Sequence, residues 1–487
     1  MASEPISRRR FVVRASSVLA VSTMLGRQQA RAAEEPPESR QAMGTRVGGV
    51  TETSAIVWTR LTKNATRNNS GIPTSNGKAK TGAPLPADVS VEQLEGACPG
   101  AAGKIRVRYG TREDLSDATA TDWVEVSAEN DFIHHFKITG LKPGTVYHYA
   151  SDTADAGGSH GSFHGRFATA PTQDTPGNFC FCVMTCQAYR DRDHHDGHNI
   201  YPAMLAMKPA FTSLTGDLVY YDTDPPAAKS MELARYHWER MFSLPRLVEF
   251  SRNAATCWLK DDHDTLKNDS WPGQHYGALT FAEGKEIFKQ QAPMEDGKTY
   301  HTFRWGRDLQ IWLTEGRDYR SPNTMPDGPG KTIWGAEQKE WFKKTVAESK
   351  ATWKILISPT PLVGPDRVED KSDNHSNSGF AHEGDEIREW LKANVAENFF
   401  VITGDRHWQY HSIHPKTGLH EFSVGAASDD HAGGSPGEDP AYHKFHRVKG
   451  GFLSVTLKAE GAQRGIAFEL RDVNGKVVYA FDRKAEV

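Results

Sequence analysis

The stretch FFVITGDRH, residues 399–407, is an apolar run that ends in Gly-Asp-X-His, with a further His411 just beyond it. Such a run predicts a buried strand that delivers an acidic and an imidazole side chain where the strand ends. Open α/β sheets place their ligands at the carboxyl ends of strands. A second stretch, AFTSLTGDLVY at 210–220, repeats the design around Gly216-Asp217. The two strand ends predict one metal centre supplied by several strands.

The composition is that of an ordinary globular chain. Its 487 residues are 37% hydrophobic and 25% charged, which predicts roughly two to four domains. A formal net charge of -4 gives no electrostatic reason to expect a nucleic-acid partner. Five cysteines, three of them within residues 180–186, do not resemble a disulfide framework. The 21 histidines, many of them beside Asp or Gly, are the unusual feature.

The N-terminus has the pattern of an export signal. SRRRFVV at 7–13 is followed by a mildly apolar segment at 15–25 and by Ala-Arg-Ala at 30–32. This pattern predicts a twin-arginine signal peptide over residues 1–32, and an ordinary signal peptide is the alternative. We therefore expect the export machinery as a partner and an extracytoplasmic mature protein without a transmembrane segment. The twin-arginine route carries folded proteins, which favours a cofactor inserted before export.

Two domains are expected after the signal. Residues 45–171 show short alternating strands with turn residues, which predict a β-sandwich. Within them, LKPGTVYHY at 141–149 resembles a corner of fibronectin type III-like domains, and 62–99 is a predicted surface insertion. From 178 to 487, strands alternate with helices, which predicts a mixed sheet flanked by helices.

Residues able to bind a metal or a phosphate follow predicted strands at five places. Taken singly, each has an ordinary explanation, such as a turn, a helix cap or a small core residue. Their serial order is that of two-metal phosphoesterases, in which a shared carboxylate bridges cations roughly 3.5–4 Å apart. Asp217 is the best bridging candidate. The five motifs are TCQ at 185–187, GDLVY at 216–220, DDH at 261–263, RDYR at 317–320 and GDRH at 404–407.

Together these motifs resemble the PhoD-type (alkaline phosphatase D) metallophosphoesterase family over nearly the whole chain. The resemblance implies a hydrolase that uses Fe³⁺ and Ca²⁺ to cleave phosphomonoesters and phosphodiesters outside the cytoplasm by attack of a metal-bound hydroxide. It also implies a twin-arginine signal and a small N-terminal β-domain. The expected fold class is α/β (α+β): a metallophosphoesterase-like double β-sheet sandwich flanked by helices, preceded by a fibronectin type III-like β-sandwich.

The resemblance also assigns metal ligands in this chain. Cys186 and Tyr220 would bind iron, and Asp217 would be shared between the metals. A thiolate and a phenolate both suit a ferric ion. Asp262 would donate oxygen to calcium. The two remaining ligands, whose division between the metals stays open, are Asp405 and His407.

Two further residues have expected roles in catalysis. His263 would hydrogen-bond phosphate or protonate the leaving oxygen, and the alternative is a buried structural histidine. Arg317 would clamp phosphate, and the alternative is an ion pair with an acid such as Asp318. Glu315 and Asp264 stand where the family usually has Asp and Glu, which puts the phosphate-side geometry in question.

Two other functions remain open at this stage. The first is a phosphodiesterase specific for phospholipid head groups or wall polymers. The second, from a different class, is an iron-containing redox or ligand-binding protein that uses the same thiolate and phenolate. Two histidine-containing loops, 190–198 and 366–383, would either line the mouth of the site or form polar surface.

Overall fold

The computed structural model describes residues 38–74, 84–295, 297–367 and 371–486. The predicted signal peptide, 1–32, lies outside these residues. In the described part of the chain, no helix is long and apolar enough to cross a bilayer.

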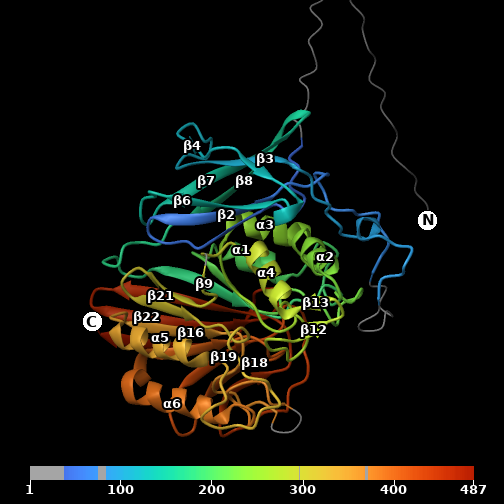
Figure 1. Ribbon diagram of the computed structural model, residues 1–487. Helices are drawn as coiled ribbons and strands as arrows, with labels where there is room; N and C mark the ends of the chain where they lie inside the picture. The colour runs from blue at the N-terminus through green and yellow to red at the C-terminus, as the bar shows by residue number, and fades with distance from the viewer. Residues whose placement is uncertain (1–37, 75–83, 296, 368–370, 487) are drawn as a thin grey trace, which may run out of the picture. The chain divides into compact units, whose positions relative to one another are not determined.

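Two large β-sheets form the centre of the molecule (Figure 1). The first has nine strands, in the order β23 (Val477–Glu486), β22 (Gln463–Arg471), β21 (Phe452–Glu460), β9 (Phe179–Met184), β10 (Thr212–Thr215), β11 (Ala255–Leu259), β1 (Thr45–Gly48), β2 (Ser54–Arg60) and β6 (Ile133–Thr139). The second has seven, in the order β14 (His301–Trp305), β15 (Leu309–Leu313), β16 (Trp353–Ser358), β17 (Phe399–Thr403), β19 (His420–Val424), β18 (Gln409–Ile413) and β20 (His443–Arg447).

Two smaller sheets and the helices complete the fold. A five-stranded sheet contains β4 (Thr119–Ala120), β3 (Gly103–Gly110), β7 (Val146–Asp155) and β8 (Gly158–Ala168), with β5 (Val124–Val126) paired to β3, and a separate hairpin joins β12 (His275–Tyr276) to β13 (Leu279–Thr280). The α-helices are α1 (Ile200–Ala206), α2 (Met231–Phe242), α3 (Pro245–Asn253), α4 (Phe281–Gln291), α5 (Gly335–Glu348) and α6 (Ala381–Val395). The 3-10 helices are η1 (Val91–Gln93), η2 (Ala128–Asn130) and η3 (Ala396–Asn398).

The two large sheets face each other across a common core, and helices cover their outer faces. Successive residues of a strand point to opposite faces, so Ile402 of β17 enters the core between the sheets while Val401 packs under α5 and α6. In β9, Val183 likewise enters the core between the sheets, while Met184 packs against the layer formed by α1 to α4. Strands β9 and β17 are almost wholly apolar because both of their faces are covered. The predicted double β-sheet sandwich flanked by helices is confirmed.

The N-terminal sandwich is built partly from the first large sheet. Its two layers are the five-stranded sheet, at the top of Figure 1, and the group β1, β2 and β6. The backbone N–H of Lys142 donates to the Tyr147 hydroxyl at 2.9 Å, which forms the corner that LKPGTVYHY predicts. However, β1 also pairs in parallel with β11 through Val47 and Ala255. One sandwich layer therefore continues the sheet of the C-terminal part and covers the edge that β11 would otherwise expose.

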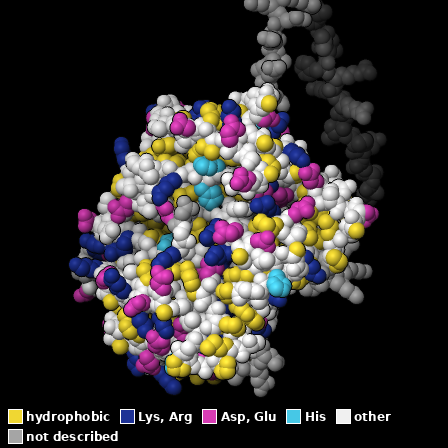
Figure 2. Space-filling view, viewed as in Figure 1, with side chains coloured by type: hydrophobic (Ala, Val, Ile, Leu, Met, Phe, Trp, Pro, Cys, Tyr) yellow, Lys and Arg dark blue, Asp and Glu magenta, His cyan; other side chains and the backbone are white. Residues whose placement is uncertain are grey.

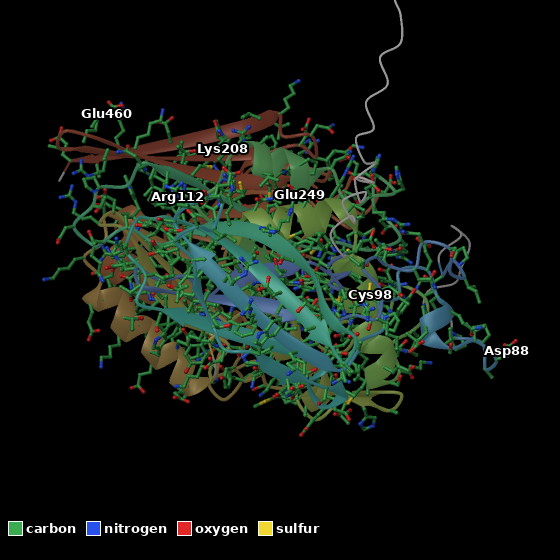
Figure 3. All side chains as sticks on the ribbon, turned by 90° about the horizontal axis from the view of Figure 1, so that it is seen from above. Asp88, Cys98, Arg112, Lys208, Glu249 and Glu460 are labelled. Carbon is green, nitrogen blue, oxygen red and sulfur yellow. The ribbon has the colours of Figure 1, made fainter. Side chains whose placement is uncertain are left out.

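The described part of the predicted insertion, 62–74 and 84–99, packs on α2. The backbone N–H of Cys98 donates to Glu239 Oε2 at 2.8 Å, and the Tyr236 hydroxyl donates to the Glu95 carbonyl at 2.8 Å. Asp88 extends at the periphery while Cys98 lies nearer the body (Figure 3). Every cysteine of the chain is free.

The parallel strands bring their carboxyl ends to one edge of each sheet. Strands β9, β10 and β11 run parallel in the first sheet, as do β15, β16, β17 and β19 in the second. The sheets meet closely at Gly404, where a Cβ atom would lie 2.5 Å from the Thr215 carbonyl oxygen and 2.7 Å from Thr185 Oγ1. A side chain does not fit there without separating the strand ends.

This close approach predicts that Gly404→Ala destabilises the fold. We expect the free energy of unfolding to fall by about 2 kcal/mol, as in other overpacked sites. The matched control is Gly465→Ala in β22, where the nearest atom to an added Cβ is 3.8 Å away. Urea denaturation of the two variants measures the effect, and equal midpoints would show that the strand ends do not meet at Gly404.

Candidate metal centre

The candidate site lies just beyond three neighbouring strands and one strand of the facing sheet. Cys186, Asp217 and Asp261 each stand two residues after β9, β10 and β11, and Asp405 stands two residues after β17. Three of these four residues have left-handed backbone: φ is 52° at Cys186, 55° at Asp217 and 61° at Asp405. Non-glycine residues seldom adopt this conformation, and such strain concentrates at functional sites.

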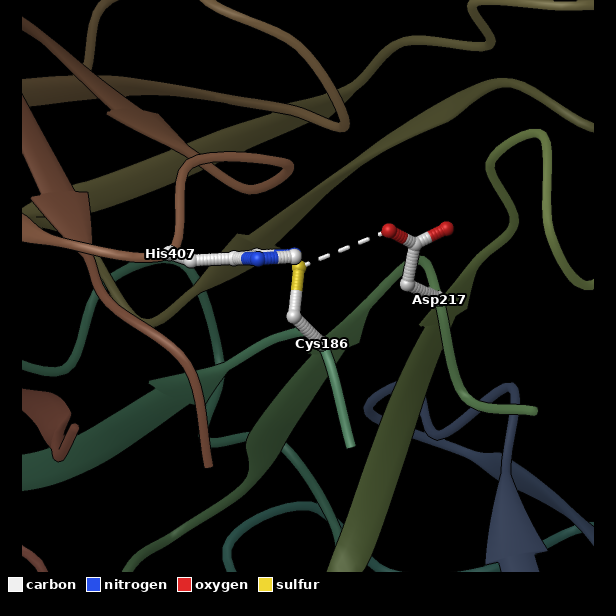
Figure 4. Close-up of side chains that lie close together, drawn as sticks. All are labelled: Cys186, Asp217 and His407. Carbon is white, nitrogen blue, oxygen red and sulfur yellow. Dashed lines mark hydrogen bonds between the residues drawn. The ribbon is translucent and has the colours of Figure 1, made fainter. Parts of the chain in front are cut away.

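A thiol, a carboxylate, a phenol and an imidazole converge at one point. Cys186 Sγ lies 3.5 Å from Asp217 Oδ2 (Figure 4), and the Tyr220 hydroxyl lies 3.3 Å from the same oxygen. The Tyr220 hydroxyl is also 3.4 Å from His407 Nε2. Donor atoms of Cys186, Asp217 and His407 lie within 4.8 Å of one another. Four residues named from sequence thus meet in one buried cluster.

Asp217 also belongs to two other groups of donor atoms. It lies with Asp262 and His263 in one, and with Asp261 and Asp405 in the other, each within 4.8 Å. Asp261 belongs to the DDH motif but was not among the ligands expected from the sequence. Like Cys186 and Asp217, Asp261 stands two residues after a parallel strand, and this shared position could have identified it as a candidate ligand.

The unpartnered oxygens of this cluster fit cations. Among the described residues, nothing hydrogen-bonds Asp217 Oδ1 or Asp261 Oδ2, although both atoms are buried. Buried polar atoms of a folded protein normally have partners, and buried carboxylates often find them in metal ions. The donor set therefore suits metal binding on both sides of Asp217.

The electrostatics of the cluster also favour cations. Burial raises the pKa of Asp217, and the carboxylates of Asp262 and Asp261 raise it further. Burial and the nearby Asp217 raise the pKa of both the Cys186 thiol and the Tyr220 phenol. Without positive charge between them, these groups resist ionising together.

Arg317 lies beneath the carboxylates. Its Nε donates to Asp261 Oδ1, and its guanidinium is 3.5 Å from Asp262 Oδ2. Burial raises the pKa of Asp261 to about 6 against the opposing effect of Arg317. Asp318, the acid suggested as an ion-pair partner from sequence, instead lies 2.8 Å from Lys260. The buried guanidinium of Arg317 thus faces two predicted or candidate ligands.

His263 is held by Asp222, an acid that no sequence motif marked. Its Nδ1 lies 2.6 Å from Asp222 Oδ1, and its ring packs on Tyr220 with centroids 4.5 Å apart. Burial disfavours the imidazolium, but the carboxylates of Asp222 and Asp262 outweigh it and keep the pKa of His263 above its ordinary value. The motif DDH thus places an imidazole, paired with the carboxylate of Asp222, beside the cluster.

The other histidines noted in the sequence lie apart from the cluster. His411, which follows the GDRH motif, hydrogen-bonds Tyr479 and His420 in the core instead of joining the centre. His194, His195 and Asp196 form a separate and more exposed group. His375 binds Glu383 at 2.9 Å. A strand ending in Gly-Asp-X-His therefore delivers only its first histidine to the site.

Known proteins share this architecture. Residues 181–450 match the family model of the PhoD-like phosphatases, and 27–171 match that of the PhoD-like phosphatase N-terminal domain. Alkaline phosphatase D of Bacillus subtilis (strain 168) is 22% identical in an alignment 458 positions long, and the match covers 82% of this chain and 71% of that protein.

Two solved structures share the fold. The structure titled "Structure of PhoD" superposes with a TM-score of 0.69 at 17% identity, covering 92% of this chain and 91% of that one. The structure of purple acid phosphatase PPD1 from yellow lupin superposes with a TM-score of 0.58 at 13% identity, covering 90% of this chain and 73% of that one. Because the match to 181–450 alone spans more than half of the sequence and the strand ends carry the expected motifs, this chain belongs to the PhoD-like phosphatase family.

Proposed function

We propose that this protein is an exported phosphoric ester hydrolase whose centre holds Fe³⁺ and Ca²⁺. The observation that carries the proposal is the shared position of Asp217 among three groups of donor atoms. A thiol and a phenol on one side of Asp217 suit ferric iron, and the carboxylates of Asp261, Asp262 and Asp405 on the other side suit calcium.

The residues around Asp217 have separable roles in ester hydrolysis. When bound, the cations polarise phosphoryl oxygens and activate water. Arg317 orients Asp261 and Asp262 through its buried contacts, so its effect on phosphate is exerted through those carboxylates. His263, oriented by Asp222, supplies the proton that the leaving oxygen needs.

The substrate class follows the family: phosphomonoesters and phosphodiesters. Side chains of both signs are interspersed over the face shown in Figure 2, so that face carries no extended single-sign surface for a polyanion. A narrower preference for phospholipid or wall-polymer diesters, and a redox or binding role for the iron, are the alternatives that the experiment separates.

The experiment begins with protein from the extracytoplasmic fraction of an expressing bacterium. We expect the as-isolated protein to show a visible tyrosinate-to-iron absorption band and to hydrolyse an aryl phosphate monoester and a bis-aryl diester, with added calcium raising both rates. Activity on phospholipid or wall-polymer diesters alone would support the narrower alternative. Colour without hydrolysis, even with calcium present, would favour the redox or binding role. Retention of the protein in the cytoplasm would contradict export.

A further inference from the structure

A chain of hydrogen bonds reaches the phenol of Tyr220 from residues outside the five strand-end motifs of the site. Asp191 Oδ2 lies 2.8 Å from His431 Nδ1, and His431 Nε2 lies 2.8 Å from the Tyr220 hydroxyl. Asp191 comes from the loop after β9 in the first sheet, and His431 comes from the loop after β19 in the second. The chain therefore links both sheets to a single oxygen atom.

His431 approaches the centre through Tyr220. Among the described residues, it joins none of the groups whose histidine, cysteine and carboxylate donor atoms all lie within 4.8 Å. Its ring lies against that of His407, with centroids 4.2 Å apart, and is nearly perpendicular to the ring of Tyr220, at 76°. His431 is therefore placed to orient the proposed metal ligand Tyr220 without being a ligand itself.

The hydrogen-bond partners of the two His431 ring nitrogens, Asp191 and Tyr220, indicate which nitrogen carries the proton. Burial acts to raise the pKa of Asp191, but the hydrogen bond and charge interaction with His431, together with the charge of Arg190, keep that pKa below its ordinary value. An ionised carboxylate only accepts hydrogen bonds, so Nδ1–H donates to Asp191 and Nε2 faces the phenol oxygen. The contact with His431 fixes one hydrogen-bonding direction of the Tyr220 hydroxyl oxygen. A second direction of the same oxygen faces Asp217.

We propose that Asp191 and His431 are a positioning pair that sets the orientation of the Tyr220 phenol and thereby the retention and colour of iron at the centre. The inference rests on the proposed function only in assigning iron to Tyr220. Partners that orient metal ligands typically change metal affinity about 10- to 100-fold. His263, bound to Asp222, packs on the ring of Tyr220, whereas His431 makes the shorter of the two histidine contacts to the Tyr220 oxygen, 2.8 Å against 3.4 Å for His407. His431 is therefore the positioning histidine whose loss should alter the phenol most directly.

The test compares His431→Phe, His431→Gln and Asp191→Asn with the wild type. His431→Phe is expected to shift the visible absorption band and to lower iron retention during dialysis against a chelator about tenfold or more. In His431→Gln the side-chain amide reaches the position of Nε2, so this variant is expected to keep most of the wild-type absorption band and most of the iron retention. The control is His195→Gln, a change at an exposed side chain in the same loop as Asp191, and it should behave as the wild type.

Two outcomes would contradict the proposal that Asp191 and His431 position the Tyr220 phenol. An unchanged band and unchanged retention in His431→Phe would show that the contact does not position Tyr220. Complete loss of iron and colour, as expected for removal of the phenol itself, would make His431 a ligand. Circular dichroism of each variant distinguishes these results from misfolding.

A second measurement separates the pair from the iron assignment. In metal-free protein with ¹⁵N-labelled histidine, Tyr220→Phe should shift the Nε2 resonance of His431, and Asp191→Asn should shift its Nδ1 resonance. If the wild type binds no iron, the iron part of the proposed function fails, while these shifts still establish the hydrogen-bonded pair and restrict its role to positioning the phenol. Resonances that do not move in either variant would refute the pair whatever the metal.

Discussion

Replacing Asp217 by Asn is expected to lower kcat for an aryl phosphate by about a thousandfold or more. Asparagine keeps the shape of the side chain and tolerates the left-handed backbone of this position, where φ is 55°. It removes the negative charge that the three donor groups share. Loss of several kcal/mol of cation-dependent transition-state stabilisation corresponds to a rate effect of this size. Steady-state kinetics with calcium supplied measures it.

The control for this variant is Asp308→Asn, a buried acid at the opposite end of β15. Its carboxylate accepts from the Gly177 N–H at 2.8 Å and from Arg464 Nε at 3.2 Å. We expect this change to lower stability while leaving kcat near the wild-type value below the unfolding transition. If Asp217→Asn retained more than a tenth of wild-type kcat, the shared role of Asp217 would be wrong.

Replacing Tyr220 by Phe is expected to remove the visible absorption band and most of the bound iron. The phenol oxygen is the atom that meets Asp217 and His407, and the ring itself fits unchanged without it. In the proposed centre, loss of one anionic donor would weaken iron binding while leaving in place the carboxylates assigned to calcium. Absorption spectra and elemental analysis of the as-isolated variant measure the effect.

Tyr221→Phe is the matched control, because it removes the neighbouring hydroxyl without touching the cluster. That hydroxyl accepts a hydrogen bond from Trp238 Nε1 at 2.7 Å in the layer of helices. We expect the variant to keep its colour and iron and to lose about 1 kcal/mol of stability. Colour that persists in Tyr220→Phe would exclude this residue as the iron ligand.

Local sequence patterns were sufficient for the parts of the site that lie on strand ends. Cys186, Asp217, Asp262 and Asp405 follow apolar runs, and the side chain after a buried strand has little freedom to go elsewhere. Long-range partners left no such signal. Asp191 and His431 are 240 residues apart in the chain, and nothing local to either marks the contact. The same holds for the pairing of β1 with β11, which joins the predicted sandwich to the main sheet.

The sequence by itself determined the double-sheet architecture, the family and most of the strand-end side chains that meet around Asp217, because strand periodicity and strand-end motifs are local properties. Only the tertiary structure decided which side chains share an oxygen or a charge. It placed Arg317 on Asp261 rather than Asp318, kept His411 out of the centre, and set His431 behind Tyr220. Each of these contacts joins a residue of one large sheet, or of a loop that follows its strands, to one of the other sheet, and no single stretch of sequence describes how two sheets pack.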